Sequence, residues 1–159
     1  MSTTFKRINW WAPQTGDEEK ALILEVLDSN FLNDGEYTTR FERMLADLLG
    51  CKHAVAVTNG TSALFLALVG SGIGPGDEVI IPDITFIATA NAVRLAGAKP
   101  VLVDVDPETL NISTEQIKSA ITTFTKAIIP VHVSGRAADM PAILSIAAKH
   151  KLLVIEDAA

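Results

Sequence analysis

Apolar positions along the first 50 residues recur at helical spacing. Thr15 and Glu18 have the spacing of a capping box, and apolar residues at positions 21–27 follow, which predicts a helix that ends near Asn30. A second helix is predicted from Thr38 or Thr39 to Gly50, because its apolar residues keep the helical period and glycine favours a left-handed C-cap. Two amphipathic helices are therefore expected at the start of the chain.

Beyond Gly50 the pattern alternates between short, uninterrupted apolar runs and helical stretches. The runs predict strands at 53–57, 78–81, 100–105, 126–131 and 152–155. Helices are predicted between them at 61–70, 86–96, 113–122 and 139–150. Strands that are apolar on both faces and are separated by helices indicate a mostly parallel sheet covered by helices on both faces. The sequence therefore predicts a doubly wound α/β fold.

Composition and charge narrow the class of protein. A chain of 159 residues with 48% hydrophobic and 20% charged residues is typical of a packed globular protein. Lys and Arg number 13 against 19 Asp and Glu, and they form no cluster, so neither nucleic acid nor a membrane is an expected partner. The single cysteine, Cys51, excludes an internal disulfide, and no apolar run near the N-terminus suggests a signal peptide. We therefore expect a cytoplasmic protein.

Side chains that could bind a ligand or take part in a reaction follow each predicted strand. Ligands of open parallel sheets bind beyond the carboxyl ends of the strands. The residues at these ends are 58–62, 82–86, Asp104 with Asp106, 132–136 and Asp157. Hydroxyls, one aromatic ring, carboxylates and an imidazole are thus expected to converge on one edge of the sheet, and no metal site is predicted among them.

The turn formed by Asn59, Gly60, Thr61 and Ser62 leads directly into an apolar helix. Free N–H groups at a helix start, two hydroxyls and a glycine can bind a phosphate. In the alternative interpretation, Thr61 and Ser62 only cap the helix. The spacing alone leaves both interpretations open.

Three other residues at these strand ends also allow two interpretations. Asp157 follows a buried strand, so its carboxylate needs a cation that the nearby sequence does not supply, unless it caps a helix or pairs with a lysine elsewhere. Phe86 is either a core residue or a stacking platform, and His132 is either a proton shuttle or a hydrogen-bonded structural imidazole. Asp104 and Asp106 are expected to order the loop in which they lie.

Taken together, several segments resemble the DegT/DnrJ/StrS family of pyridoxal-phosphate-dependent sugar aminotransferases, which have fold type I. The resemblance runs in unbroken order through residues 37–42, 58–64, 75–80, 85–91, 97–101, 125–132 and 154–159. It implies the large domain of a fold type I transferase, with pyridoxal 5'-phosphate (PLP) as cofactor.

The resemblance also implies a role for each candidate site residue. Gly60, Thr61 and Ser62 would hold the cofactor phosphate. Phe86 would stack on one face of the pyridine ring, and Ala159 would pack against the other face. Asp157 would bind the protonated ring nitrogen, which supplies the missing cation.

The resemblance further predicts the domain organisation. Residues 1–37 would form an N-terminal helix and arm, and residues 38–159 the N-terminal part of the PLP-binding domain. The lysine that forms the Schiff base in this family is expected beyond Ala159. The chain is therefore expected to be an N-terminal fragment that has no transaminase activity alone.

The implied reaction transfers an amino group from glutamate to a nucleotide-linked keto sugar, in cell-surface polysaccharide or secondary-metabolite sugar biosynthesis. A homodimer is implied, with residues 33–35 as a candidate contact. Residues 133–136 depart from the family's Tyr-Gly-Gln pattern, which leaves the sugar open, and Arg136 is expected to be exposed. Two alternatives remain, a sugar dehydratase of the same family and a receiver-like signalling module.

Overall fold

The computed structural model describes residues 12–159, which divide after Ala56 into two units. The first unit contains helix α1 (Asp17–Asp28) and helix α2 (Glu36–Leu49). Helix α1 is capped by Gly16 and Glu19, whose carboxylate accepts the Gly16 N–H at 2.6 Å, and not by the expected pair one residue earlier. The expected left-handed C-cap of α2 is confirmed at Gly50, with a φ of 65°.

The expected domain boundary after residue 37 stays a prediction, and residues 1–11 of the expected N-terminal arm lie outside the described residues. Helix α2 begins two or three residues earlier than predicted, because Gly35 provides the extended N-cap. The hydroxyl of Tyr37 in its first turn donates a hydrogen bond to the carboxylate of Glu25 on α1. The two helices are thus joined by a polar contact.

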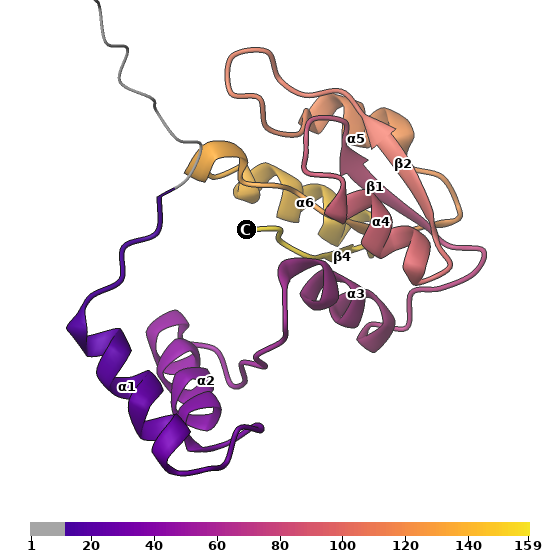
Figure 1. Ribbon diagram of the computed structural model, residues 1–159. Coiled ribbons are helices and arrows are strands. Elements are labelled where there is room, and N and C mark those ends of the chain that lie inside the picture. The colour runs from indigo at the N-terminus through magenta and orange to yellow at the C-terminus, as the bar shows by residue number, and fades with distance from the viewer. Residues whose placement is uncertain (1–11) are drawn as a thin grey trace, which may run out of the picture. The chain divides into compact units, whose positions relative to one another are not determined.

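The second unit is an α/β layer structure around four parallel strands (Figure 1). The strands are β1 (Glu78–Pro82), β2 (Lys99–Val103), β3 (Thr125–Ile128) and β4 (Leu153–Val154), in the order β2-β1-β3-β4. The helices are α3 (Gly60–Gly70), α4 (Ala88–Leu95), α5 (Thr114–Ala120) and α6 (Met140–His150), with the short 3-10 helix η1 (Val133–Gly135). The predicted parallel sheet is confirmed.

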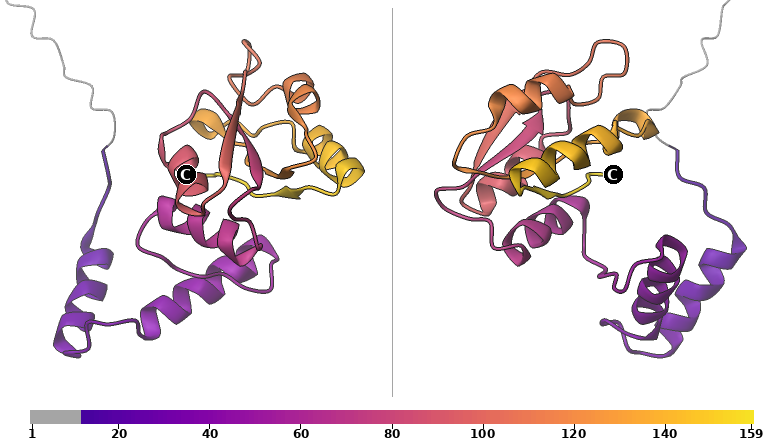
Figure 2. Two further views of the ribbon diagram at one scale, coloured as in Figure 1. Left: turned by 90° about the vertical axis from the view of Figure 1, so that its right-hand side faces the viewer. Right: turned by 180° about the vertical axis from the view of Figure 1, so that it is seen from behind.

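Successive apolar side chains of β1 point to opposite faces of the sheet, which explains why helices cover both faces. Val79 and Ile81 are fully buried in a cluster with α3 and α4, whereas Ile80 is fully buried in a second cluster with α5 and α6. Successive side chains of a strand point to opposite faces, so a run of apolar residues needs a helical layer on each side. Figure 2 shows the helices on the two sides of the strands.

The strand predicted at 53–57 is wrong. These residues form no part of the sheet, and Val55 remains 75% exposed. A β-strand exists only where a neighbour supplies hydrogen-bond partners, and none of the described residues pairs with this run. Within residues 12–159, no helix has the length and apolar character that crossing a bilayer requires.

Strands β3 and β4 are shorter than predicted, but their pairing continues beyond their formal ends. Val131 and Asp157 form a parallel bridge in the register already set by Ile128 and Val154. The Asp157 N–H donates to the carbonyl of Pro130 at 2.9 Å, and the His132 N–H donates to the carbonyl of Asp157 at 3.0 Å. The main chain of Asp157 is therefore fixed by the sheet.

Candidate functional site

The orientation of Asp157 follows from its place in this extended ladder. Ile155, two residues earlier, packs against the cluster formed with α3 and α4. Since side chains two residues apart in an extended strand share a face, Asp157 points to the same side of the sheet. Its carboxylate is thus directed toward α4 and the start of α3.

The Asp157 side chain is buried and hydrogen-bonded but has no cationic partner. The residue is only 7% exposed. Oxygen Oδ2 accepts a hydrogen bond of 2.7 Å from the hydroxyl of Thr89 on α4, and Oδ1 accepts the N–H of Ala159 at 3.3 Å. Among residues 12–159, no Lys, Arg or His lies within ion-pair distance of this carboxylate. A buried carboxylate is costly without a counter-charge, so the site is suited to an external cation.

Helix α3 begins at the same edge, and its first turn has free hydrogen-bond donors. Asn59 is the N-cap, since its side-chain oxygen accepts the Ser62 N–H at 2.9 Å. The N–H groups of Gly60 and Thr61, and the hydroxyls of Thr61 and Ser62, have no hydrogen-bond partner among the described residues. The interpretation of Thr61 and Ser62 as caps is therefore wrong, and their hydroxyls are available to a ligand.

The start of α3 lies against Ala159. A Cβ atom placed on Gly60 would be 3.7 Å from the Cβ of Ala159, which is ordinary van der Waals contact. Figure 1 shows the C-terminal residue beside the first turn of α3. The structure thus brings the expected phosphate-binding turn and the Asp157 region together, although Gly60 and Ala159 are 99 positions apart in the sequence.

Phe86 lies in the turn that precedes α4. Its side chain is not part of the core, because the residue is 78% exposed. The Thr89 N–H donates to the Phe86 carbonyl at 3.2 Å, so the turn that carries Phe86 is continuous with the residue that binds Asp157. The interpretation of Phe86 as a core residue is wrong, and its stacking role stays a prediction.

His132 occupies a structural position at this edge. The Ala138 N–H donates to His132 Nδ1 at 3.1 Å, so Nδ1 is the unprotonated nitrogen. Nε2 then carries the proton and donates it to the carboxylate of Glu156 at 3.0 Å. Both ring nitrogens are bound, which favours a structural imidazole over a proton shuttle.

The acidic residues after β2 order their own loop, as expected. Asp106 Oδ1 accepts the N–H groups of Thr109 and Glu108 at 2.9 and 3.0 Å, and these bonds together with the Thr109 hydroxyl hold its pKa below the ordinary value. Asp104 accepts the N–H of the next residue. Arg136 is exposed and donates to the Glu108 carbonyl. In the described part of the chain, no group of three or more His, Cys, Asp or Glu residues is arranged so that it could hold a metal ion.

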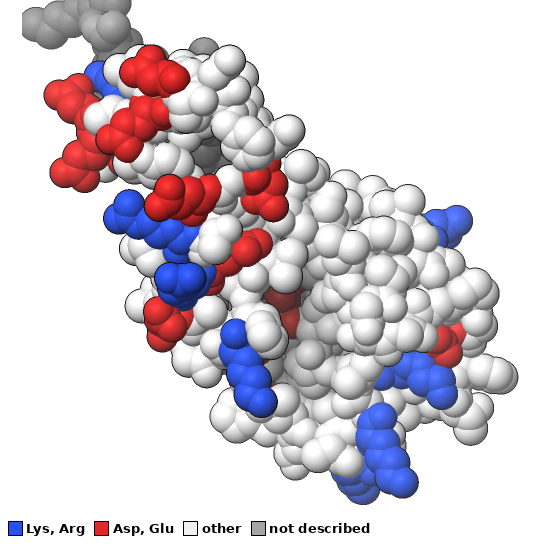
Figure 3. All heavy atoms as spheres, turned by 90° about the horizontal axis from the view of Figure 1, so that it is seen from below, with Lys and Arg blue, Asp and Glu red and all other residues white. Residues whose placement is uncertain are grey.

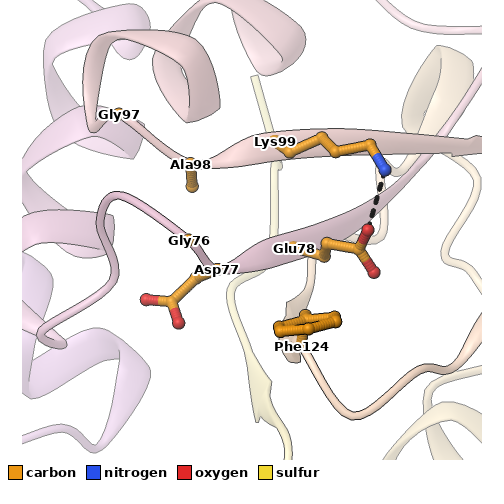
Figure 4. A pocket seen from close by; sticks show the side chains of 7 residues that line it. All are labelled: Gly76, Asp77, Glu78, Gly97, Ala98, Lys99 and Phe124. Atoms are coloured by element: carbon orange, nitrogen blue, oxygen red, sulfur yellow. Dashed lines mark hydrogen bonds and ion pairs between the residues drawn. The ribbon is translucent and has the colours of Figure 1, made fainter.

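A pocket of about 300 Å³ lies at the opposite edge of the sheet (Figure 4). It is lined by Gly76, Asp77, Glu78, Gly97, Ala98, Lys99 and Phe124. Lys99 is already paired with Glu78 at 2.8 Å, and Asp77 accepts the Gly74 N–H at 3.0 Å, so the one cation among these lining residues is already neutralised. On the face shown in Figure 3, the Lys and Arg side chains of the described residues form no continuous basic surface.

Two residues of the site were not singled out from the sequence. Asn59 was assigned only to the turn, although asparagine is among the preferred N-cap residues and its position before Gly60 was a usable signal. Thr89 was assigned only to a helix. Its signal is weak, because a threonine in a helix becomes informative only when its hydroxyl is known to be buried against a carboxylate.

A sequence profile of the DegT/DnrJ/EryC1/StrS aminotransferase family matches residues 13–159. The chain belongs to this family. Membership rules out the receiver-like module that the sequence left open. It also agrees with the fold, since a solved DegT/DnrJ/EryC1/StrS aminotransferase of Brucella abortus superposes on the chain with a TM-score of 0.86.

Two solved structures and one curated relative illustrate the similarity of this family member. The chain is 51% identical over 154 residues to GDP-perosamine synthase of Caulobacter vibrioides, covering 96% of this chain and 42% of that protein. It is 41% identical to NtdA of Bacillus subtilis with bound cofactor PMP, with a TM-score of 0.85 and coverage of 90% and 34%. An aminotransferase of Psychrobacter cryohalolentis is 42% identical, with a TM-score of 0.88 and coverage of 91% and 37%. The chain thus spans 34–42% of the length of these three proteins.

Proposed function

We propose that the protein is a PLP-dependent aminotransferase that acts on a nucleotide-linked keto sugar. One observation carries this proposal: the carboxylate of Asp157 is buried without a cationic partner among the described residues. A protonated pyridine nitrogen is a cation of suitable size and geometry for a single carboxylate. The relatives named above, one of them with bound PMP, support the same cofactor.

The donor set at the start of α3 fits the phosphate of this cofactor. Two N–H groups, of Gly60 and Thr61, and two hydroxyls, of Thr61 and Ser62, lie in one helical turn and have no hydrogen-bond partner within residues 12–159. A helix N-terminus attracts an anion through its dipole by about 0.3–1 kcal/mol, and direct hydrogen bonds add to this attraction. The site therefore offers donors for the anionic end of PLP and a carboxylate for its cationic ring.

The two faces of the ring are assigned to Phe86 and Ala159. Phe86 is exposed on the turn before α4, so its ring is free to stack on an aromatic ligand. Ala159 lies beside Gly60 and presents only a methyl group, which leaves room for a flat ring. Together they would exclude water from the ring that Asp157 binds.

When bound, PLP supplies an electron sink for the loss of the α-proton from an amino acid. Within this chain, the proposed task of Asp157 is to keep the proton on the ring nitrogen, since only the protonated ring accepts the electrons well. The α3 donors would hold the phosphate in place, so that the ring cannot slide away from Asp157. Glutamate is the proposed amino donor, and a homodimer is the proposed assembly.

The test uses the protein expressed from its complete reading frame and reconstituted with PLP. We expect visible absorption from the bound cofactor that is lost on addition of glutamate and restored by a GDP-linked keto sugar. Amino transfer to the sugar is then measured by mass spectrometry of the product. Failure to bind PLP would overturn the proposal, and loss of the sugar hydroxyl without gain of nitrogen would point instead to the dehydratase of the same family.

A further inference from the structure

We infer that Thr89 is a positioning residue that fixes the orientation of the Asp157 carboxylate toward the cofactor ring. This inference rests on the proposed function. Its physical basis is the hydrogen bond of 2.7 Å between Thr89 Oγ1 and Asp157 Oδ2, which joins α4 to the end of the extended β3–β4 ladder. Both residues are buried, and Thr89 has no exposed surface.

The direction of this hydrogen bond follows from counting protons. An ionised carboxylate can only accept, so the single hydroxyl proton of Thr89 is donated to Asp157. The Thr89 oxygen then accepts from the hydroxyl of Thr85, which lies 2.8 Å away. The other acceptor near the Thr85 hydroxyl, the Phe86 carbonyl, is more distant at 3.3 Å. A chain of two hydroxyls therefore runs from the turn before α4 to the carboxylate.

This chain limits how the carboxylate can rotate. Oδ2 is held by the Thr89 hydroxyl and Oδ1 by the Ala159 N–H, so the two contacts lie on different oxygens and oppose rotation about the last side-chain bond of Asp157. A carboxylate held in one orientation binds a ring N–H without first losing rotational freedom. The main chain places Asp157, and Thr89 sets the plane of its carboxyl group.

Threonine is otherwise a poor choice for this position. A hydroxyl buried without a partner is costly, and a β-branched residue loses rotamer freedom in a helix. Valine has nearly the same shape without the hydroxyl, so the hydrogen bond to Asp157 accounts for the threonine better than packing does. Thr89→Val therefore isolates the hydroxyl.

The experiment is a double-mutant cycle on PLP affinity in the protein expressed from its complete reading frame. Dissociation constants for PLP are measured by equilibrium dialysis for the wild type, Thr89→Val, Asp157→Asn and the double variant. We expect Thr89→Val to weaken PLP binding about tenfold, as for the loss of a hydrogen bond to a charged group, and Thr89→Ser to stay within about threefold of the wild type. In the Asp157→Asn background, Thr89→Val should change the affinity less than about twofold.

Two further variants separate orientation from general destabilisation. Thr125→Val removes another buried threonine hydroxyl, at the opposite edge of the sheet, and should leave PLP affinity unchanged. Thr85→Val removes the outer hydroxyl of the chain and should weaken binding by less than Thr89→Val does. This variant provides a second test if Thr89→Val does not fold.

The outcomes distinguish the inference from the proposed function. Wild-type protein that does not bind PLP overturns the proposed function. Wild-type protein that binds PLP, together with a Thr89→Val variant of equal affinity, overturns the inference alone. A Thr89→Val effect that persists at full size in the Asp157→Asn background also overturns it, because the hydroxyl would then act independently of the carboxylate.

Discussion

The ammonium group of Lys99 on β2 lies 2.8 Å from the carboxylate of Glu78 on the adjacent strand β1. Thr122 adds a hydrogen bond of 2.6 Å from its hydroxyl to the same carboxylate. These two contacts, that of Lys99 first, lower the pKa of Glu78 from its ordinary value of 4.5, against the smaller opposing effect of burial. The amino ends of the central strand β1 and the edge strand β2 are thus joined by a charged cluster.

The lowered pKa of Glu78 predicts a pH dependence of stability. Because the pKa is lower in the folded state, the contribution is fully present above the unfolded-state value and is lost as the pH falls through the folded-state value. Glu78→Gln should lower the urea midpoint at pH 7, and its difference from the wild type should shrink at a second pH chosen well below the ordinary pKa of 4.5. Glu115→Gln, which removes an exposed pair with Lys118, is the control and should change the midpoint little at either pH.

Gly97 is expected to tolerate no side chain. Its φ is 83°, and a Cβ there would lie 3.0 Å from Cγ of Pro75. Gly97→Ala should therefore cost about 2 kcal/mol in the free energy of unfolding, measured with urea. Gly70→Ala, in α3, meets nothing within 4 Å and has no positive φ, so it should be neutral or stabilising by about 0.5 kcal/mol. Equal effects of the two changes would contradict the prediction.

Substitutions in the first turn of α3 should distinguish residues that stabilise the fold from residues that bind the cofactor. Asn59→Ala removes the N-cap and should cost about 1 kcal/mol in the free energy of unfolding. Thr61→Val and Ser62→Ala remove hydroxyls that make no hydrogen bond to any described residue, so each should change the stability of the cofactor-free protein by less than about 0.5 kcal/mol. Both should weaken PLP binding, as measured by equilibrium dialysis. Destabilisation by these hydroxyl variants as large as that of Asn59→Ala would restore the capping interpretation.

Asp157→Asn tests the proposed role of the buried carboxylate in catalysis. The asparagine amide has nearly the same shape as the carboxylate and can still accept a hydrogen bond from the Thr89 hydroxyl. It carries no negative charge, however, and cannot neutralise the protonated pyridine ring. We expect the variant to retain some PLP and to lose turnover by roughly 100-fold or more, the size typical of a preorganised electrostatic group. Turnover is measured as amino transfer from glutamate. A variant with wild-type kcat would remove Asp157 from the proposed mechanism.

Local patterns were sufficient to predict the sheet and its covering layers. The run of Val79, Ile80 and Ile81 has no polar member, and the structure buries all three by placing helices on each face. The run at 53–57 looks the same in the sequence. Whether such a run becomes a strand depends on a neighbour elsewhere in the chain, and none pairs with it among the described residues. Apolar character therefore predicted suitability for a strand, and pairing decided which runs became strands.

The candidate site could be predicted only in part for the same reason. Asp157 stood out because a carboxylate directly after a buried strand is unusual, and Gly60 because it opens an apolar helix. Thr89 did not stand out, since its significance depends on a contact with a residue 68 positions later. Residues that bind a ligand directly carry signals in their own neighbourhood, whereas residues that act through another residue do not.

Because the register of β3 and β4 is continuous up to Asp157, the site depends more on the number of residues between Val154 and Asp157 than on their identity. Asp157 faces α4 because it lies two positions after Ile155 in the extended ladder, so the two side chains share a face. One residue inserted between Val154 and Asp157 would turn the carboxylate to the face covered by α5 and α6, far from the donors of α3. A single-residue insertion here would therefore abolish cofactor binding while leaving every side chain of the site intact.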